Sequence, residues 1–252
     1  MRLALLIEYD GTDFAGWQVQ PGVRTVQSEI ETAIAKVLQE NLGIIGAGRT
    51  DAGVHATGMV AHFDLSDQLT ITPEKLCEAL NGLTGFDVVI HDIREVVSNF
   101  HARYSALSRE YQYTISKVKT ALKRNYSWHV RQDLNLTSMK SICSEIIGDH
   151  DFTSFSKRTD DVEHYRCIVE NCEITEISHE LVITIRANRF VRGMVRGLAG
   201  AMIEVGKGNM SIEHFLKILH TPTQENRAKF LAPAKGLVFI KVLYPNECAL
   251  WK

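Results

Sequence analysis

The stretch GIIGAGRTDAGVHATG, residues 43–58, combines five glycines with one arginine, one aspartate and one histidine. Glycine lets another backbone or a ligand come close, and it permits positive φ. The carboxylate of Asp51 can serve as a nucleophile or base, and a neighbouring cation such as Arg49 favours its ionised form. The stretch therefore predicts a site where something large lies against the main chain, with Arg49 and Asp51 presented to it.

Two nucleotide-binding motifs resemble this stretch without matching it. Gly46-x-Gly48 begins like the dinucleotide fingerprint, but the third glycine must follow three residues later, and Asp51 stands there. A carboxylate at that position would repel a pyrophosphate, and no Gly-Lys-Ser/Thr of a P-loop occurs. A nucleotide-dependent oxidoreductase is therefore disfavoured.

A metal site is also disfavoured. Asp51, His55 and His62 fit no standard zinc spacing, and no cysteine lies near them. We expect His55 to hold the glycine-rich loop by hydrogen bonds instead.

Composition limits the class of protein. The chain has 252 residues, a net charge of −2 and five cysteines without a Cys-x-x-Cys, which favours reduced thiols in a cytosolic protein. The overall charge gives no sign of nucleic-acid binding, which would have to come from local clusters of arginine and lysine. No apolar run approaches the length of a membrane span, and the N-terminal apolar segment is typical of a strand and not of a signal peptide.

The elements that must position these residues alternate along the chain. Alternating or short apolar runs predict strands over 2–10, 58–65, 87–96, 109–117 and 236–244, and a hairpin across Ser178-His179. Helical periodicity and capping residues predict helices over 25–39, 72–83, 136–148, 189–206 and 211–220. Thr72 is the expected N-cap of the second helix and Thr137 a possible cap of the third. We expect two α+β halves, residues 1–105 and 106–252.

Several blocks in order along the chain resemble the tRNA pseudouridine synthase A family. They are EYDGTDFAGWQVQ (8–20), GRTDAGVHA (48–56), FHARYSA (100–106), REYQYTI (109–115), DFTSF (151–155) and NRFVRGMVRGLAG (188–200). The chain departs from the family pattern at Leu83-Thr84, at the acidic segment 159–166 and at Arg192-Gly193.

The resemblance implies an α+β pseudouridine synthase fold. Its two halves are expected around a pseudo-twofold axis, with a mixed, largely antiparallel central sheet and Asp51 at the floor of a basic cleft. It implies a cytoplasmic homodimer that isomerises uridine to pseudouridine at positions 38, 39 and 40 of the tRNA anticodon stem-loop. No cofactor and no metal are expected.

The family match also assigns roles to residues of this chain. Asp51 matches the catalytic aspartate, and Arg196 is the expected ion-pair partner of Asp51. Arg49 is expected to fill the opening left by the flipped base and to touch phosphate. Tyr111 matches the active-site tyrosine, whose ring can stack on the extruded uracil, whereas Tyr113 is expected to be structural. Whether Asp51 adds to C1′, adds to the base or removes the 2′ proton stays open.

Further basic residues are candidates for an RNA surface. Arg189, Arg192 and Arg196 recur at spacings of three and four, which would place them on one helix face. The other candidates are Arg24, Arg103, Lys157, Arg158 and Arg166.

The alternative to an isomerase is a tRNA-binding, chaperone-like module without catalysis. The presence of Asp51, Tyr111 and Arg196 together disfavours it.

Overall fold

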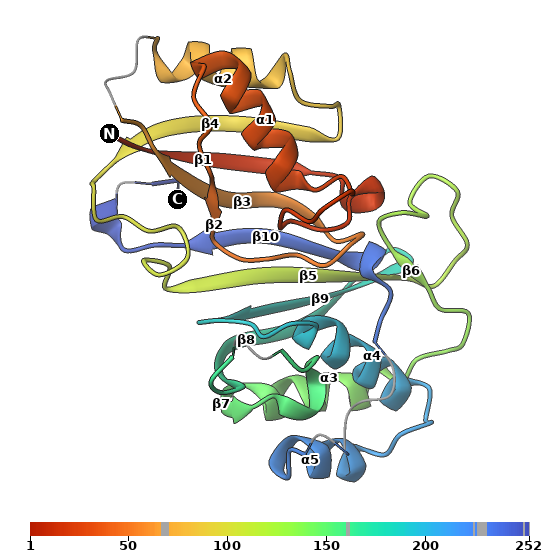
Figure 1. Ribbon diagram of the computed structural model, residues 1–252. Coiled ribbons are helices and arrows are strands. Elements are labelled where there is room, and N and C mark those ends of the chain that lie inside the picture. Colours follow the sequence, from red (N-terminus) through yellow and green to blue (C-terminus); the bar gives the residue numbers. More distant parts are fainter. Residues whose placement is uncertain (67–70, 160–161, 224, 226–230, 249, 252) are drawn as a thin grey trace. The chain divides into compact units, whose positions relative to one another are not determined.

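The computed structural model describes residues 1–66, 71–159, 162–223, 225, 231–248 and 250–251. The chain forms two compact units (Figure 1). The first consists of Met1–Ser108 together with Phe239–Lys252, and the second of Arg109–Val238.

The first unit is built on antiparallel strands. The order is β4 (Val88–Val96), β1 (Arg2–Tyr9), β3 (His55–Asp64), β10 (Leu237–Leu243), and the short β2 (Ile45–Gly46) pairs with β3. Strand β1 is antiparallel to both β3 and β4, with a register irregularity on each side. Consecutive residues of β1 and of β3 are buried, so side chains on both faces of these strands belong to the core of the unit.

Two helices lie over the β4–β1 side of this sheet (Figure 1). Helix α1 (Val26–Leu38) begins with a capping box in which Thr25 and Ser28 satisfy each other's backbone amides. Helix α2 (Pro73–Asn81) begins as expected, with Thr72 accepting from the amide of Lys75 and proline in the first turn.

The second unit has its own antiparallel strands. The order is β5 (Ser108–Ser116), β9 (Glu180–Ala187), β8 (Arg166–Ile177), β7 (Gly148–Asp151), and β6 (Trp128–His129) pairs parallel with β5. The expected hairpin is confirmed: β8 and β9 are joined through Ser178, which has φ of 55°.

Three helices belong to the second unit. They are α3 (Leu136–Ile146), α4 (Met194–Gly206) and α5 (Ile212–His220); α3 lies against β8 and α4, and α5 against β7 (Figure 1). The cap of α3 is Asn135 and not Thr137, since its side chain accepts from the amide of Ser138. Short 3-10 turns are η1 (Gly11–Asp13), η2 (Thr153–Phe155), η3 (Ala234–Gly236) and η4 (Asn246–Cys248).

The helix expected over 189–206 is shorter than its sequence pattern suggests. Gly193 has φ of 77°, a left-handed conformation that an α-helix cannot contain, so α4 begins only at Met194. Arg189 and Arg192 lie before this residue, and the expectation that they share a helix face with Arg196 is wrong.

None of the helices in the described ranges is long and apolar enough to cross a membrane.

Candidate active site

Asp51 stands at the start of a tight turn that leads into β3. The amide of Val54 donates to the carbonyl of Asp51 at 3.1 Å, and Gly53 has φ of 77°. Glycine is the residue that adopts this conformation without steric cost. Asp51 is half-buried and Arg49 is exposed. Strand β3 begins at His55, three residues before the expected start, so the turn is joined directly to the sheet.

The residues before and at Asp51 are bound to the segment Tyr9–Trp17. The hydroxyl of Tyr9 lies 2.8 Å from that of Thr50, and the amide of Trp17 donates to the carbonyl of Thr50 at 3.1 Å. Gly16 and Asp51 pair in an isolated antiparallel bridge. The backbone of the candidate catalytic residue is therefore held by the end of β1 and the turn after it.

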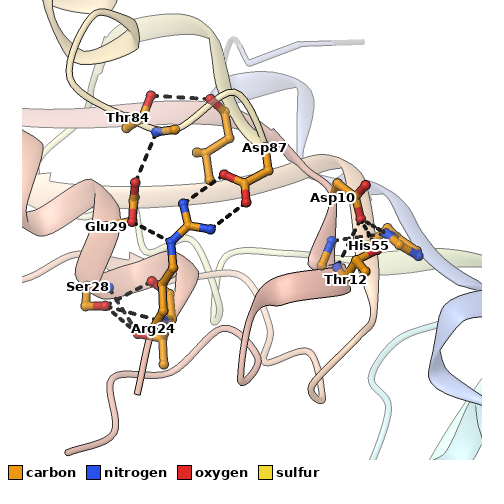
Figure 2. Close-up of polar contacts among 12 residues, drawn as sticks. Asp10, Thr12, Arg24, Ser28, Glu29, His55, Thr84 and Asp87 are labelled. Atoms are coloured by element: carbon orange, nitrogen blue, oxygen red, sulfur yellow. Dashed lines mark hydrogen bonds and ion pairs between the residues drawn. The ribbon is translucent and has the colours of Figure 1, made fainter. Parts of the chain in front are cut away.

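His55 binds the same segment from the other side of the turn. Its Nδ1 lies 3.0 Å from the amide nitrogen of Gly11 and 3.0 Å from Oδ1 of Asp10. Oδ1 of Asp10 also accepts from the backbone amide and the hydroxyl of Thr12 (Figure 2). His55 is buried and hydrogen-bonded beside the loop, as the sequence predicts.

The close approach that the glycines permit is used by the chain's own residues. A Cβ at Gly46 would lie 2.7 Å from the ring of Trp17, and one at Gly11 would lie 2.0 Å from the carbonyl oxygen of Val54. At Gly46, and at Gly11 within the segment itself, glycine thus lets the segment Tyr9–Trp17 lie directly against the loop and the turn.

Tyr111 belongs to the second unit. It lies on β5, is buried, and meets the ring of Phe190 edge to face, with centroids 4.9 Å apart and planes at 81°. Tyr113 points to the same face of the strand and is fully buried. Its hydroxyl donates to the carbonyl of Pro233 at 2.9 Å, and burial raises the pKa of this phenol. These contacts give Tyr113 a structural role.

Arg196 lies in the first turn of α4 and is half-buried. Its Nε donates to the carbonyl of Ala232 at 2.8 Å, and the amide of Ala232 donates back to the carbonyl of Arg196 at 3.1 Å. This pair of bonds fixes the base of the guanidinium to the segment that precedes η3.

Arg24, a candidate for the RNA surface, is held within the first unit. Its guanidinium binds both carboxylate oxygens of Asp87, at 2.5 and 2.8 Å, and Glu29 at 3.0 Å (Figure 2). The hydrogen bonds that Arg24 donates to Asp87 and Glu29 raise the pKa of Arg24. The guanidinium also lies over the ring of Phe14, 4.2 Å from its centroid. Arg24 therefore ties the start of α1 to the loop before β4.

The remaining basic candidates are on the surface of their units. Arg103 and Arg158 are exposed, Lys157 is half-buried, and Arg166 pairs with Asp149 at 3.0 Å. In the acidic segment 159–166, Asp160 and Asp161 lie outside the described residues.

The residues that hold the turn were not identified as site residues from the sequence. Tyr9, Gly11, Gly16 and Trp17 lie in the block EYDGTDFAGWQVQ, whose only local signal is two glycines among polar and aromatic residues. Within the described ranges, no group of three or more His, Cys, Asp and Glu residues is arranged to hold a metal ion.

Comparison with known proteins identifies the family. A family model described as tRNA pseudouridine synthase matches residues 5–105 and 142–245. The tRNA pseudouridine synthase A of Bacteroides fragilis is 39% identical over 249 residues, covering 98% of this chain and 97% of the relative. Those of Brevibacillus brevis and Listeria innocua are 39% and 38% identical, each covering 96% of this chain and 99% of the relative. The chain therefore belongs to the tRNA pseudouridine synthase family.

Proposed function

We propose that this protein isomerises uridine to pseudouridine at positions 38, 39 and 40 in the anticodon stem-loop of tRNA. The observation that carries the proposal is the family match over nearly the whole chain, together with an Asp51 turn held by backbone bonds on both sides. A base within a stem cannot be reached by a side chain, so the enzyme flips the nucleotide out before it reacts.

The reaction breaks the C1′–N1 bond, turns the uracil and forms a bond from C1′ to C5. An ionised carboxylate can drive this exchange by attacking C1′, by adding to the base or by removing the 2′ proton. All three routes require Asp51 to be deprotonated and held at a fixed distance from the nucleoside. The backbone contacts of Thr50, Asp51 and Val54 support such a fixed position.

Residues 1–105 supply the catalytic loop and residues 106–252 supply Tyr111 and Arg196. Asp51 is the catalytic residue, and Tyr111, Arg49 and Arg196 bind the substrate. The ring of Tyr111, set by Phe190, stacks on the flipped uracil, a contact worth about 1–3 kcal/mol per base. Arg49, exposed one residue before the Thr50 anchor, occupies the opening left by the base and contacts phosphate. Arg196, whose Nε donates to the Ala232 carbonyl, holds its guanidinium in a fixed direction.

The working form is a cytoplasmic homodimer in which one tRNA contacts both subunits, without a cofactor or a metal. The matching relatives are bacterial tRNA-modifying proteins by name, which supports tRNA as the substrate.

The test is tritium release from tRNA carrying 5-tritiated uridine, followed by mapping of pseudouridine at the three positions. The wild type should release tritium, Asp51→Asn should release none while still binding tRNA, and Asp133→Asn, at an exposed carboxylate of the second unit, should match the wild type. A wild type that binds tRNA and leaves every uridine unchanged would favour the chaperone-like module instead.

A further inference from the structure

Two histidines of β3 make the same kind of hydrogen bond at opposite ends of the strand. Nδ1 of His55 accepts from the amide of Gly11 at 3.0 Å, and Nδ1 of His62 accepts from the amide of Ala102 at 3.2 Å. Both side chains are buried, at 3% and 2% exposure. They differ in their distance from the Asp51 turn. His55 directly follows the turn, and His62 is seven residues further along the chain.

The turn is anchored at each of its ends to the segment Tyr9–Trp17. Before Asp51, Thr50 is bound by Tyr9 and Trp17. After Asp51, Val54 is in backbone contact with Gly11, where even a Cβ would lie 2.0 Å from the Val54 carbonyl oxygen. At this second end the two backbones are joined by the strand pairing of Tyr9 with Ala56 and by the side-chain bond from the Gly11 amide to His55 Nδ1.

The two neighbours of His55 Nδ1 require different protonation states. The amide of Gly11 can donate to this nitrogen only when the nitrogen carries no proton, whereas the carboxylate of Asp10 binds it only when it carries one. The carboxylate of Asp10 has two further donors from Thr12 at the same oxygen, so it does not depend on the histidine. The bond from the Gly11 amide therefore needs the tautomer of His55 whose Nδ1 carries no proton.

We propose that His55 is a positioning residue for Asp51, acting through the bond from the Gly11 amide to Nδ1. The inference rests on the proposed function, in which Asp51 is the catalytic residue. Loss of this bond lets the end of the turn move away from Gly11 and carries the carboxylate with it. A displacement of about 1 Å at a reacting group can cost about a hundredfold in rate.

The experiment compares His55→Asn, His55→Gln and His55→Leu with the matched control His62→Leu. Asparagine places an acceptor oxygen where Nδ1 stood, whereas glutamine places its amide near the position of Nε2. We expect the single-turnover rate on bound tRNA to fall about 10- to 100-fold in His55→Gln and His55→Leu. His55→Asn should recover most of the rate, and tRNA affinity should change less than threefold in all of them.

His62→Leu removes the buried bond from Ala102 and a bond to the backbone of Ile45, so it should lower thermal stability at least as much as His55→Leu while leaving the single-turnover rate unchanged. Asp10→Asn, which keeps an acceptor for Thr12 and removes the charge, should also react at the wild-type rate. If His55→Leu does not fold, the contrast between Asn and Gln at this position decides the question.

Three results would overturn the proposal: equal rates in His55→Asn and His55→Gln, equal loss of rate in His62→Leu and His55→Leu, or a loss in Asp10→Asn as large as in His55→Gln. A wild type that forms no pseudouridine would contradict the proposed function itself, and it is recognised before any variant is measured.

Discussion

Gly16 faces the backbone of Thr50 so closely that a Cβ on the glycine would lie 2.7 Å from the Thr50 carbonyl oxygen. Gly16 also has φ of 106°, where a side chain is strained whatever the space around it. Gly16→Ala should therefore lower the free energy of unfolding by at least about 2 kcal/mol and reduce the rate of pseudouridine formation. Gly22 is the control, because it has φ of 75° with nothing within 4 Å of its Cβ position. Gly22→Ala should cost only the conformational penalty of about 1–2 kcal/mol and leave the rate of pseudouridine formation unchanged. Urea denaturation measures the stability of the two variants, and tritium release measures their rates.

The fork of Arg24 on Asp87 and Glu29 predicts a stability effect that depends on geometry and on salt. Arg24→Lys keeps the charge and loses the two-pronged contact, so we expect a loss of about 1 kcal/mol, since the side chain is 38% exposed and partly screened. Urea denaturation in low salt and in 1 M salt should show the difference from wild type shrinking at high salt. A difference that grows with salt would contradict the electrostatic explanation.

The contact between Arg24 and Glu29 predicts that the stability of the protein falls in acid. The hydrogen bond from Arg24 lowers the pKa of the Glu29 carboxyl, so the folded state holds the ionised form more strongly than the unfolded state does. This contribution is fully present above the unfolded pKa of about 4.5 and is lost as the pH falls through the lower folded value. Unfolding of Glu29→Gln followed from pH 6 to pH 3 should show a weaker dependence on pH than the wild type in that window.

Buried His62 predicts a second loss of stability on acidification, which begins at a higher pH than the loss due to Glu29. Burial lowers its pKa from 6.5 to about 4, with smaller contributions from Arg2 and His101, while Asp64 acts in the opposite direction. The unfolded chain therefore binds this proton first, and stability falls as the pH drops from 6.5 to about 4, by up to about 3 kcal/mol. Urea denaturation at intervals of half a pH unit measures the slope. In His62→Asn the slope over this window should be shallower, and a slope equal to the wild type would show that other groups are responsible.

Tyr111 can be tested for two separate roles. Tyr111→Phe keeps the ring against Phe190, so tRNA affinity should stay within about threefold of the wild type if stacking is the contact that matters. Tyr111→Leu removes the aromatic face and should lower affinity for tRNA about 5- to 100-fold. A fall in the single-turnover rate of Tyr111→Phe with unchanged affinity would assign proton transfer to the hydroxyl.

The bond of Arg196 to Ala232 predicts that replacing this arginine by lysine slows the reaction more than the same change at Arg192. Lysine cannot reproduce the bond from Nε to the Ala232 carbonyl while also presenting charge in the same direction. Arg196→Lys should reduce the rate about tenfold or more, whereas Arg192→Lys, at an exposed residue before the helix, should change it less than about threefold. Equal effects would mean that both act only through their charge on the RNA.

Elements with a local signal were predicted well from the sequence. Thr72 and Pro73 mark the start of α2, and the alternating residues on both sides of Ser178 mark the β8–β9 hairpin. The start of α4 was misplaced because the apolar spacing continues through Gly193, and only the backbone conformation there ends it. Short strands such as β2 and β6 carry too few residues for a periodic pattern and depend on their partners in the sheet.

The contacts of the candidate site could not be predicted in the same way. The residues Arg49 and Asp51 stand out in sequence because they are charged residues among glycines. Their supports, such as the bridge from Gly16 to Asp51 and the bond from Gly11 to His55, join residues more than thirty positions apart. Such pairings depend on how β1 and β3 align, which no window of local sequence contains.

Strand β10 follows the second unit in sequence, yet most of it belongs to the unit that contains Asp51. As the ribosome makes this protein, residues 109–238 are complete before the last stretch of the first unit exists. The usual order, in which the earliest domain matures first, is thus reversed here. The strands of the first unit can therefore be completed only after the whole of the second unit has been synthesised.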